Sequence, residues 1–151
     1  MFNEVIGFTG TRDGMTSQQM DALRNFLRGA FTQTRNVPTF LHGDCVGADA
    51  EAHSVAREIG FEIVVMPSTA KTRAFCTGAA TVFPPKDPVD RDRDIALHCD
   101  MLVAAPREIE EVTRSGTWMT ARHAHRLGKR VLVILPTGRT MWFRSREDIA
   151  A

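Results

Sequence analysis

Three glycine-containing loops carry the residues best suited to hold a phosphate. They read GTRDG, HGDCVGAD and RSGT, and each stands shortly before a segment in which apolar residues recur at helical spacing. Backbone N–H groups at a helix start bind anions, and an arginine adds a charge-assisted, bidentate contact. The first and third loops therefore predict a phosphate site made of Gly10, Thr11, Arg12, Ser115, Gly116 and Thr117. The alternative for the first loop is a simple turn in which Arg12 pairs with Asp13.

The second loop could contact the rest of such a ligand. Its predicted contacts are His42, Gly43, Asp44, Gly47, Ala48 and Asp49. Asp44 and Asp49 can accept hydrogen bonds from ribose hydroxyls or a base; equally, Asp44 suits a turn and Asp49 suits a helix start, where the dipole stabilises a carboxylate. His42 is either an acid–base group near the phosphate or a hydrogen-bonded structural residue.

Short apolar runs alternate with helical patterns and determine where these loops lie. Strands are predicted at residues 5–9, 39–42, 61–66, 101–105 and 131–135, and helices at 16–31, 48–59, 89–98 and 117–127. This alternation indicates βαβ units and a parallel sheet covered on both faces. We expect an α/β, Rossmann-like three-layer sandwich with a mostly parallel sheet of about five strands, in which the loops meet at the carboxyl edge.

Length and composition exclude several classes of protein. The 151 residues suit one domain, 1–151, and a net charge of +1 gives no global attraction to nucleic acid. No apolar run approaches the roughly 20 residues that span a bilayer, and the N-terminus lacks a signal-peptide pattern, so we expect a cytoplasmic protein without membrane contact. Three cysteines without CxxC spacing indicate free thiols and predict neither metal nor disulfides; no cofactor is expected.

Three further features leave alternatives open. The stretch from Pro67 to Pro88 has little periodicity, as functional loops often do, and the tail 137–151 with Trp142 and Phe143 is expected to dock on the body or on another subunit. Trp118 is a stacking surface or part of the core. The basic run from Arg122 to Arg130 is a solvated helix face or a contact for a polyanion.

Together with DRDRDIALHCDMLVAAP and RSGTWMTARHAHRLGKRVLVILP, these loops resemble the SLOG superfamily of Rossmann-like nucleotide-binding proteins from about Val5 to Pro136. The chain most resembles the small stand-alone YspA-like members, whose second loop has a similar HGxxxGAD sequence. The superfamily also includes LOG-type phosphoribohydrolases, the DNA-processing protein A family, which binds single-stranded DNA, and sensors of NAD-derived nucleotides. The resemblance implies a nucleotide-type ligand and a homo-oligomer, such as a dimer, but leaves the function open.

One departure from the LOG pattern ranks these functions. The glutamate of the LOG motif PGGxGTxxE is replaced here by Thr120, whereas Arg91 matches the arginine of the LOG site and is the candidate catalytic residue. A threonine cannot act as a general base, so Asp92, Asp94 or Asp44 would have to supply a carboxylate. We therefore expect a protein that binds or senses a nucleotide or NAD-type phosphorylated ligand. The alternatives are a nucleotide N-glycosidase and, more weakly, a single-stranded DNA-binding protein, so enzymatic activity stays open.

Overall fold

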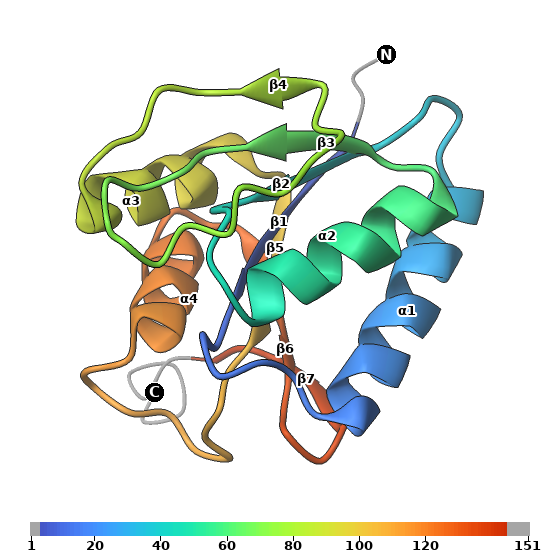
Figure 1. Ribbon diagram of the computed structural model, residues 1–151. Coiled ribbons are helices and arrows are strands. Elements are labelled where there is room, and N and C mark those ends of the chain that lie inside the picture. Colours follow the sequence, from blue (N-terminus) through green and yellow to red (C-terminus); the bar gives the residue numbers. More distant parts are fainter. Residues whose placement is uncertain (1–3, 145–151) are drawn as a thin grey trace.

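Short apolar strands and amphipathic helices alternate along residues 4–144, the part of the chain that the computed structural model describes (Figure 1). The strands are β1 (Val5–Gly10), β2 (Thr39–His42), β3 (Glu62–Val65), β4 (Thr81–Val82), β5 (Met101–Ala105), β6 (Arg130–Ile134) and β7 (Thr140–Trp142). The helices are α1 (Ser17–Thr32), α2 (Ala48–Ile59), α3 (Pro88–His98) and α4 (Gly116–Arg126).

The strands form one sheet in the order β4-β3-β2-β1-β5-β6-β7. All neighbours are parallel except β6 and β7, which are antiparallel. The α/β, Rossmann-like class is confirmed, but the expected number of about five strands is wrong, because the sheet has seven. The two missed strands are only two and three residues long, and their side chains are exposed, so neither produces an apolar run.

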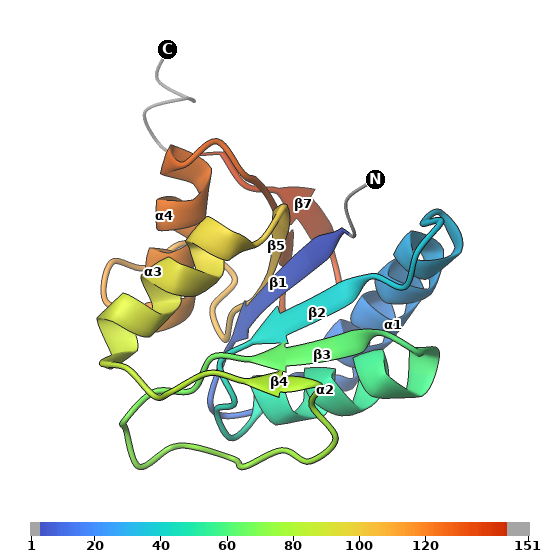
Figure 2. The same cartoon turned by 90° about the horizontal axis from the view of Figure 1, so that it is seen from above.

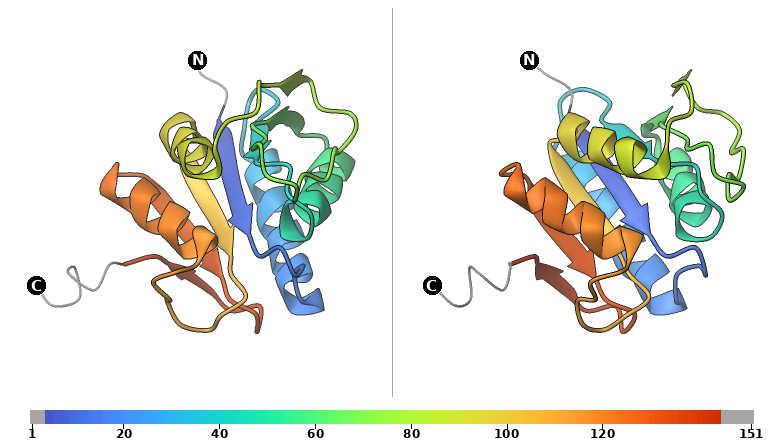
Figure 3. Two further views of the ribbon diagram at one scale, coloured as in Figure 1. Left: turned by 60° about the vertical axis from the view of Figure 1, so that its left-hand side comes forward. Right: turned by 90° about the vertical axis from the view of Figure 1, so that its left-hand side faces the viewer.

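Helices cover both faces of the sheet, which gives three layers (Figures 2 and 3). One core cluster joins α1 and α2 to the sheet around Phe8 and Phe40, and the other joins α3 and α4 around Leu102 and Trp118. β1 and β5 lie side by side in the middle of the sheet. Within the described range, no helix is both long and apolar enough to cross a membrane.

The tail docks on the body through β7. Phe143 is buried and its ring lies 6.4 Å from that of Trp118 and 5.3 Å from that of His125. Trp118 is itself 3% exposed and donates its indole N–H to Glu108, so it belongs to the core. The remainder of the expected docking segment, residues 145–151, lies outside the described residues.

Candidate functional site

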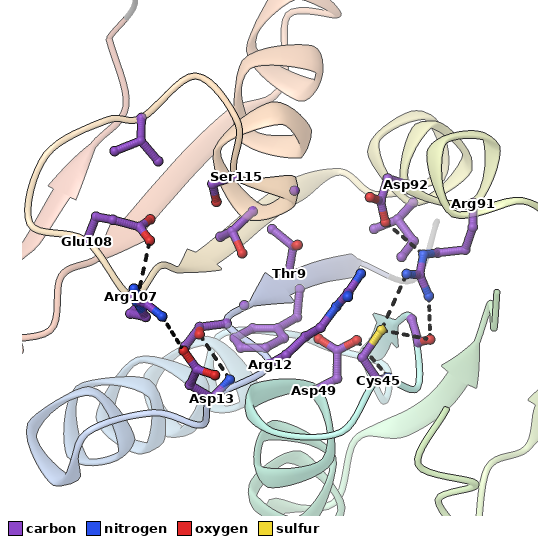
Figure 4. Close-up of a pocket in the computed structure, with 18 of the residues that line it drawn as sticks. Thr9, Arg12, Asp13, Cys45, Asp49, Arg91, Asp92, Arg107, Glu108 and Ser115 are labelled. Atoms are coloured by element: carbon purple, nitrogen blue, oxygen red, sulfur yellow. Dashed lines mark hydrogen bonds and ion pairs between the residues drawn. The ribbon is translucent and has the colours of Figure 1, made fainter. Parts of the chain in front are cut away.

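A cavity of about 460 Å³ lies at the carboxyl end of the sheet (Figure 4). It is bounded by the loops that follow β1, β2 and β5, by α3 and by the start of α4. Consecutive strands run outward from β1 to β4 on one side, and the chain then returns to β5 on the other. Parallel α/β sheets bind ligands at this kind of reversal, and the volume suits a small molecule.

The structure brings most of the residues singled out in the sequence to this cavity. Nine line it: Gly10, Thr11, Arg12, Gly43, Asp49, Arg91, Ser115, Gly116 and Thr117. Four others do not: His42, Asp44, Gly47 and Ala48.

The start of α4 presents unpaired hydrogen-bond donors to the cavity. The Ser115 hydroxyl accepts the N–H of Trp118 at 3.3 Å, whereas the N–H groups of Gly116 and Thr117 have no intrahelical acceptor. Thr117 is only 7% exposed, and its hydroxyl makes no hydrogen bond within residues 4–144. The hydroxyl oxygen is not among the sealed-off polar atoms of the described chain, so it is open to hydrogen bonding from the cavity.

Charged side chains surround the cavity, and two of its four arginines form no ion pair within the described residues. The set consists of Arg12, Arg91, Arg107 and Arg114 with Asp13, Asp49, Asp92 and Glu108. Arg107 pairs with Asp13 at 2.8 Å, so Asp13 does not pair with Arg12 as the alternative had it. Arg12 and Arg114 are exposed, and neither forms a hydrogen bond or an ion pair from its side chain within the described range. Both guanidinium groups are therefore available to an anion.

The backbone of the loop after β1 is mostly engaged by the protein itself. The Thr11 N–H donates to Ala105 O at 3.0 Å, and that of Gly14 donates to Thr11 O at 3.3 Å. From residue 11 to 16, only the N–H of Arg12 has no acceptor in the described chain. Of the N–H groups in this loop, only that of Arg12 is thus left for a ligand, and the loop contributes to the cavity mainly through its side chains and wall.

The small residues of the second loop allow it to pack closely against the loop that follows β1. The Ala48 N–H donates to Thr11 O at 2.9 Å, and Gly47 has φ +85. A Cβ at Gly47 would overlap the Arg12 carbonyl, and a Cβ at Gly10 would lie 2.6 Å from that of Ala48. Gly47 and Ala48 thus place the loop that carries Arg12, and the close approach that they permit is to this loop.

Arg91 is a buried side chain whose donors are mostly used by neighbouring groups. Its Nε donates to Asp92 at 2.7 Å, Nη1 donates to the carbonyl of Gly43, and Nη2 donates to Cys45 Sγ at 3.4 Å. A Cβ at Gly43 would overlap the guanidinium, so a larger residue there would displace Arg91 from these contacts. The contacts make Arg91 a residue that positions the second loop and Asp92.

Two carboxylates reach the cavity beside Arg91. Asp49 accepts the Cys45 N–H at 3.1 Å, and burial raises its pKa to about 6. Burial also raises the pKa of Asp92. Asp94, in contrast, pairs with Lys86 at 2.6 Å and does not line this cavity.

Thr120, which the sequence resemblance matched to the LOG glutamate, does not line the cavity either. Its hydroxyl donates to the carbonyl of Gly116 at 2.8 Å, one turn earlier in α4. Of the three carboxylates that the sequence suggested, Asp92, Asp94 and Asp44, only Asp92 therefore lines the cavity.

His42 lies in a buried hydrogen-bond chain away from the cavity. Its Nδ1 accepts the Asp44 N–H at 3.0 Å, and its Nε2 lies 2.9 Å from Nδ1 of His53, whose Nε2 is 2.8 Å from the carbonyl of Thr77. One assignment of protons satisfies all of these contacts: both rings are neutral and protonated on Nε2. Burial, followed by the electrostatic interaction with His53, lowers the pKa of His42 to about 3.

The same rings and Cys76 offer ligand atoms within 4.8 Å of one another. A metal bound to Nε2 of a neutral His42 would require the proton on Nδ1, directly opposite the Asp44 N–H. The arrangement therefore favours hydrogen bonding at His42 over metal ligation.

Asp44 is a buried anchor for the long segment between β3 and β4. Its carboxylate accepts the Cys76 N–H at 2.9 Å and Nε of Arg73 at 3.1 Å. Burial alone would raise the pKa of Asp44, but these hydrogen bonds outweigh it and hold the pKa below its usual value. Asp44 thus fixes the stretch that the sequence marked as a long loop.

Replacing Asp44 by Asn is expected to lower the free energy of unfolding by about 2–3 kcal/mol, since hydrogen bonds to an ionised, buried group are lost. Asn tolerates the φ of +58 at this position, so the change tests the charge and not the backbone. Urea unfolding of this variant and of Asp94→Asn makes the comparison. The Asp94 variant removes the more exposed ion pair to Lys86 and is expected to cost under about 1 kcal/mol. Equal losses would contradict the assignment.

Some cavity residues were missed in the sequence. Arg107 and Glu108 directly follow β5, so the rule that placed the other loops at the carboxyl edge could have found them. The basic run after Arg122, by contrast, is partly engaged by the protein. Arg122 pairs with Glu111 at 2.8 Å, and Lys129 donates to the carbonyls of Leu97 and Cys99.

No family model and no curated protein sequence matches the chain. Solved structures are similar to it. The molybdenum cofactor binding protein from the phototrophic bacterium Rippkaea orientalis has a TM-score of 0.70 at 15% identity, over 89% of this chain and 78% of that one. The structural genomics target TM1055 has a TM-score of 0.63 at 16% identity, over 85% of this chain and 72% of that one. The molybdenum cofactor carrier protein from Chlamydomonas reinhardtii has a TM-score of 0.62 at 20% identity, over 87% of this chain and 76% of that one. At these identities the likeness establishes a shared fold.

Proposed function

We propose that the cavity binds a phosphorylated ligand of nucleotide type and that the protein acts as a binding or sensing module. One observation carries the proposal: the unpaired N–H groups at the start of α4 and the unpaired side chains of Arg12 and Arg114 face the same cavity. A helix N-terminus and free guanidinium groups are complementary to phosphate in both charge and geometry. The nucleotide part of the proposal rests on the resemblance of the loops.

The Arg12→Ala variant is expected to bind a nucleoside 5′-monophosphate roughly tenfold or more weakly, because a charge-assisted contact to the phosphate is lost. Isothermal titration calorimetry measures the effect. Arg28→Ala is the matched control, since Arg28 is an exposed arginine on α1 and does not line the cavity. Unchanged affinity in the Arg12 variant, or an equal loss in both variants, would contradict the proposal.

The ligand itself can be sought in the purified protein by mass spectrometry. Two of the similar structures are proteins described as binding or carrying the molybdenum cofactor, so this cofactor belongs in the ligand panel beside nucleotides. An intact nucleotide that survives incubation with fresh protein supports a binding or sensing function.

Hydrolysis of an N-glycosidic bond is the second candidate function. It is favoured by one observation, the presence of two carboxylates, Asp49 and Asp92, in the cavity that would hold the ligand. Release of a free base from a nucleoside monophosphate would support this candidate. Salt-dependent retention of single-stranded DNA without nucleotide binding would instead support the third option.

A further inference from the structure

The cavity has a second polar region on the side formed by α2 and α3. Asp49, Arg91 and Asp92 lie together there, whereas Ser115, at the start of α4, lies on the other side (Figure 4). The negative charge of Asp92 is among the causes that raise the pKa of Asp49, so the two carboxyl groups are close enough to interact. The two sides thus differ in chemistry: the start of α4 offers unpaired N–H donors, whereas the other side offers carboxylate oxygens among positive charges, since both Arg91 and Arg12 act on Asp92.

Both carboxylates keep acceptor capacity that the protein does not use. A carboxylate has about four acceptor positions. The shortest hydrogen bonds are one from the Cys45 N–H to Asp49 Oδ2 and one from Arg91 Nε to Asp92 Oδ1. The Gly43 backbone also interacts with Asp49, and the Thr120 side chain with Asp92. The Asp92 side chain is 28% exposed and Asp49 is 5% exposed, and both line the cavity. A ligand that places donors on this side would satisfy them.

The charge of this region selects neutral donors over ions. The charge of Arg91 acts on both acids, and its guanidinium already donates to Asp92, to Gly43 and to Cys45. A second phosphate would meet two carboxylates, and a ligand cation would meet the guanidinium. Hydroxyl groups meet neither penalty, and carboxylates are known acceptors for ribose hydroxyls in Rossmann-like sites.

The unpartnered hydroxyl of Thr117 is a second polar group that opens into the cavity. This side chain is buried, lines the cavity from α4 and has no protein partner in the described chain. It lies in the first turn of the helix, beside the N–H groups proposed to hold the phosphate. A ligand that reaches from Thr117 to Asp92 would therefore carry its phosphate at one end and hydroxyls at the other.

We infer that Asp49 and Asp92 bind the hydroxyls of a ribose whose 5′-phosphate lies at the start of α4, so that the site takes ribosyl and not deoxyribosyl phosphates. This inference rests on the proposed function. It moves the sugar contact from Asp44, which the structure places outside the cavity, to Asp92.

Calorimetry with inorganic phosphate, ribose 5-phosphate and 2-deoxyribose 5-phosphate tests the inference. Wild-type protein is expected to bind the ribose compound roughly tenfold more tightly than the deoxyribose compound, as one hydrogen bond to a charged acceptor is lost. Asp92→Asn is expected to reduce this ratio to roughly threefold or less, with little change in affinity for inorganic phosphate. Asp49→Asn, with its own unfolding curve as a check of folding, should act in the same direction.

The control is Asp94→Asn, which makes the same change two residues along α3 but outside the cavity, and it should keep the wild-type ratio. Equal binding of the two sugar phosphates by wild-type protein would overturn the inference while the phosphate site stands. The inference would also be overturned if Asp92→Asn and Asp94→Asn changed the preference for the ribose compound equally. If neither sugar phosphate nor inorganic phosphate binds, the proposed function itself is overturned, and the inference with it.

Discussion

Acidification from about pH 6.5 to roughly pH 4.5 is expected to remove up to about 3 kcal/mol of stability through His42 alone. The pKa of this buried imidazole is lowered from 6.5 to about 3, so it stays neutral in the folded protein while the unfolded chain takes up a proton. The unfolded state therefore binds more protons between these two values, and the free energy of unfolding falls as the pH falls through this window. Above about pH 6.5 the effect vanishes.

Other groups add to the pH dependence, so the test compares two proteins. Asp49, whose pKa is raised to about 6, has the opposite sign, because the folded state takes up a proton that the unfolded chain still lacks. The pKa of Asp92 is also raised, while that of His123 is lowered like that of His42. All three groups are present in both wild-type protein and His42→Asn.

Urea unfolding of both proteins at several pH values gives the difference between their free energies of unfolding. Below pH 6.5, the free energy of unfolding of the wild-type protein should fall relative to that of the variant by about 1.4 kcal/mol per pH unit. Asn keeps an acceptor for the Asp44 N–H but does not titrate. A difference independent of pH would show that His42 is not held neutral.

The main elements of the fold could be predicted because each leaves a periodic signal. Strands such as β5, with all five residues buried, read as continuous apolar runs, and α1 shows both helical spacing and a capping box at Thr16. β4 and β7 could not be predicted, because their side chains are exposed and the strands exist only through pairing with β3 and β6. Such pairing depends on the rest of the sheet and not on the local sequence.

The site was predictable in location but not in the use of each residue. Loops after parallel strands are expected to meet at the carboxyl edge of the sheet, and Arg12, Thr117 and Asp49 do line one cavity there. The sequence could not distinguish Arg91, whose donors are engaged by the protein, from Arg12, whose guanidinium is unpaired. Both are arginines in polar loops or helix starts, and only the tertiary contacts separate them.

Replacing Gly47 by Ala is expected to lower the free energy of unfolding by about 3 kcal/mol or more and to weaken phosphate binding as well. Gly47 has φ +85 and ψ −127, a backbone conformation that residues other than glycine rarely adopt, and a Cβ there would overlap the carbonyl of Arg12. Backbone atoms cannot move aside as a flexible side chain does. The loop after β1 would have to shift, and the unpaired guanidinium of Arg12 would shift with it.

The matched control is Gly29→Ala, which adds the same methyl group to a glycine of α1 that has no atom within 4 Å of the new Cβ. Alanine favours a helix over glycine, so this variant should be more stable by about 0.5–1 kcal/mol and bind phosphate as the wild type does. Urea unfolding and calorimetry with inorganic phosphate measure both effects. Because the two substitutions are chemically identical, opposite signs of the stability change can arise only from the backbone conformation and surroundings of the two glycines. A Gly47 variant that is as stable as wild type would show that the two loops do not pack as closely as described.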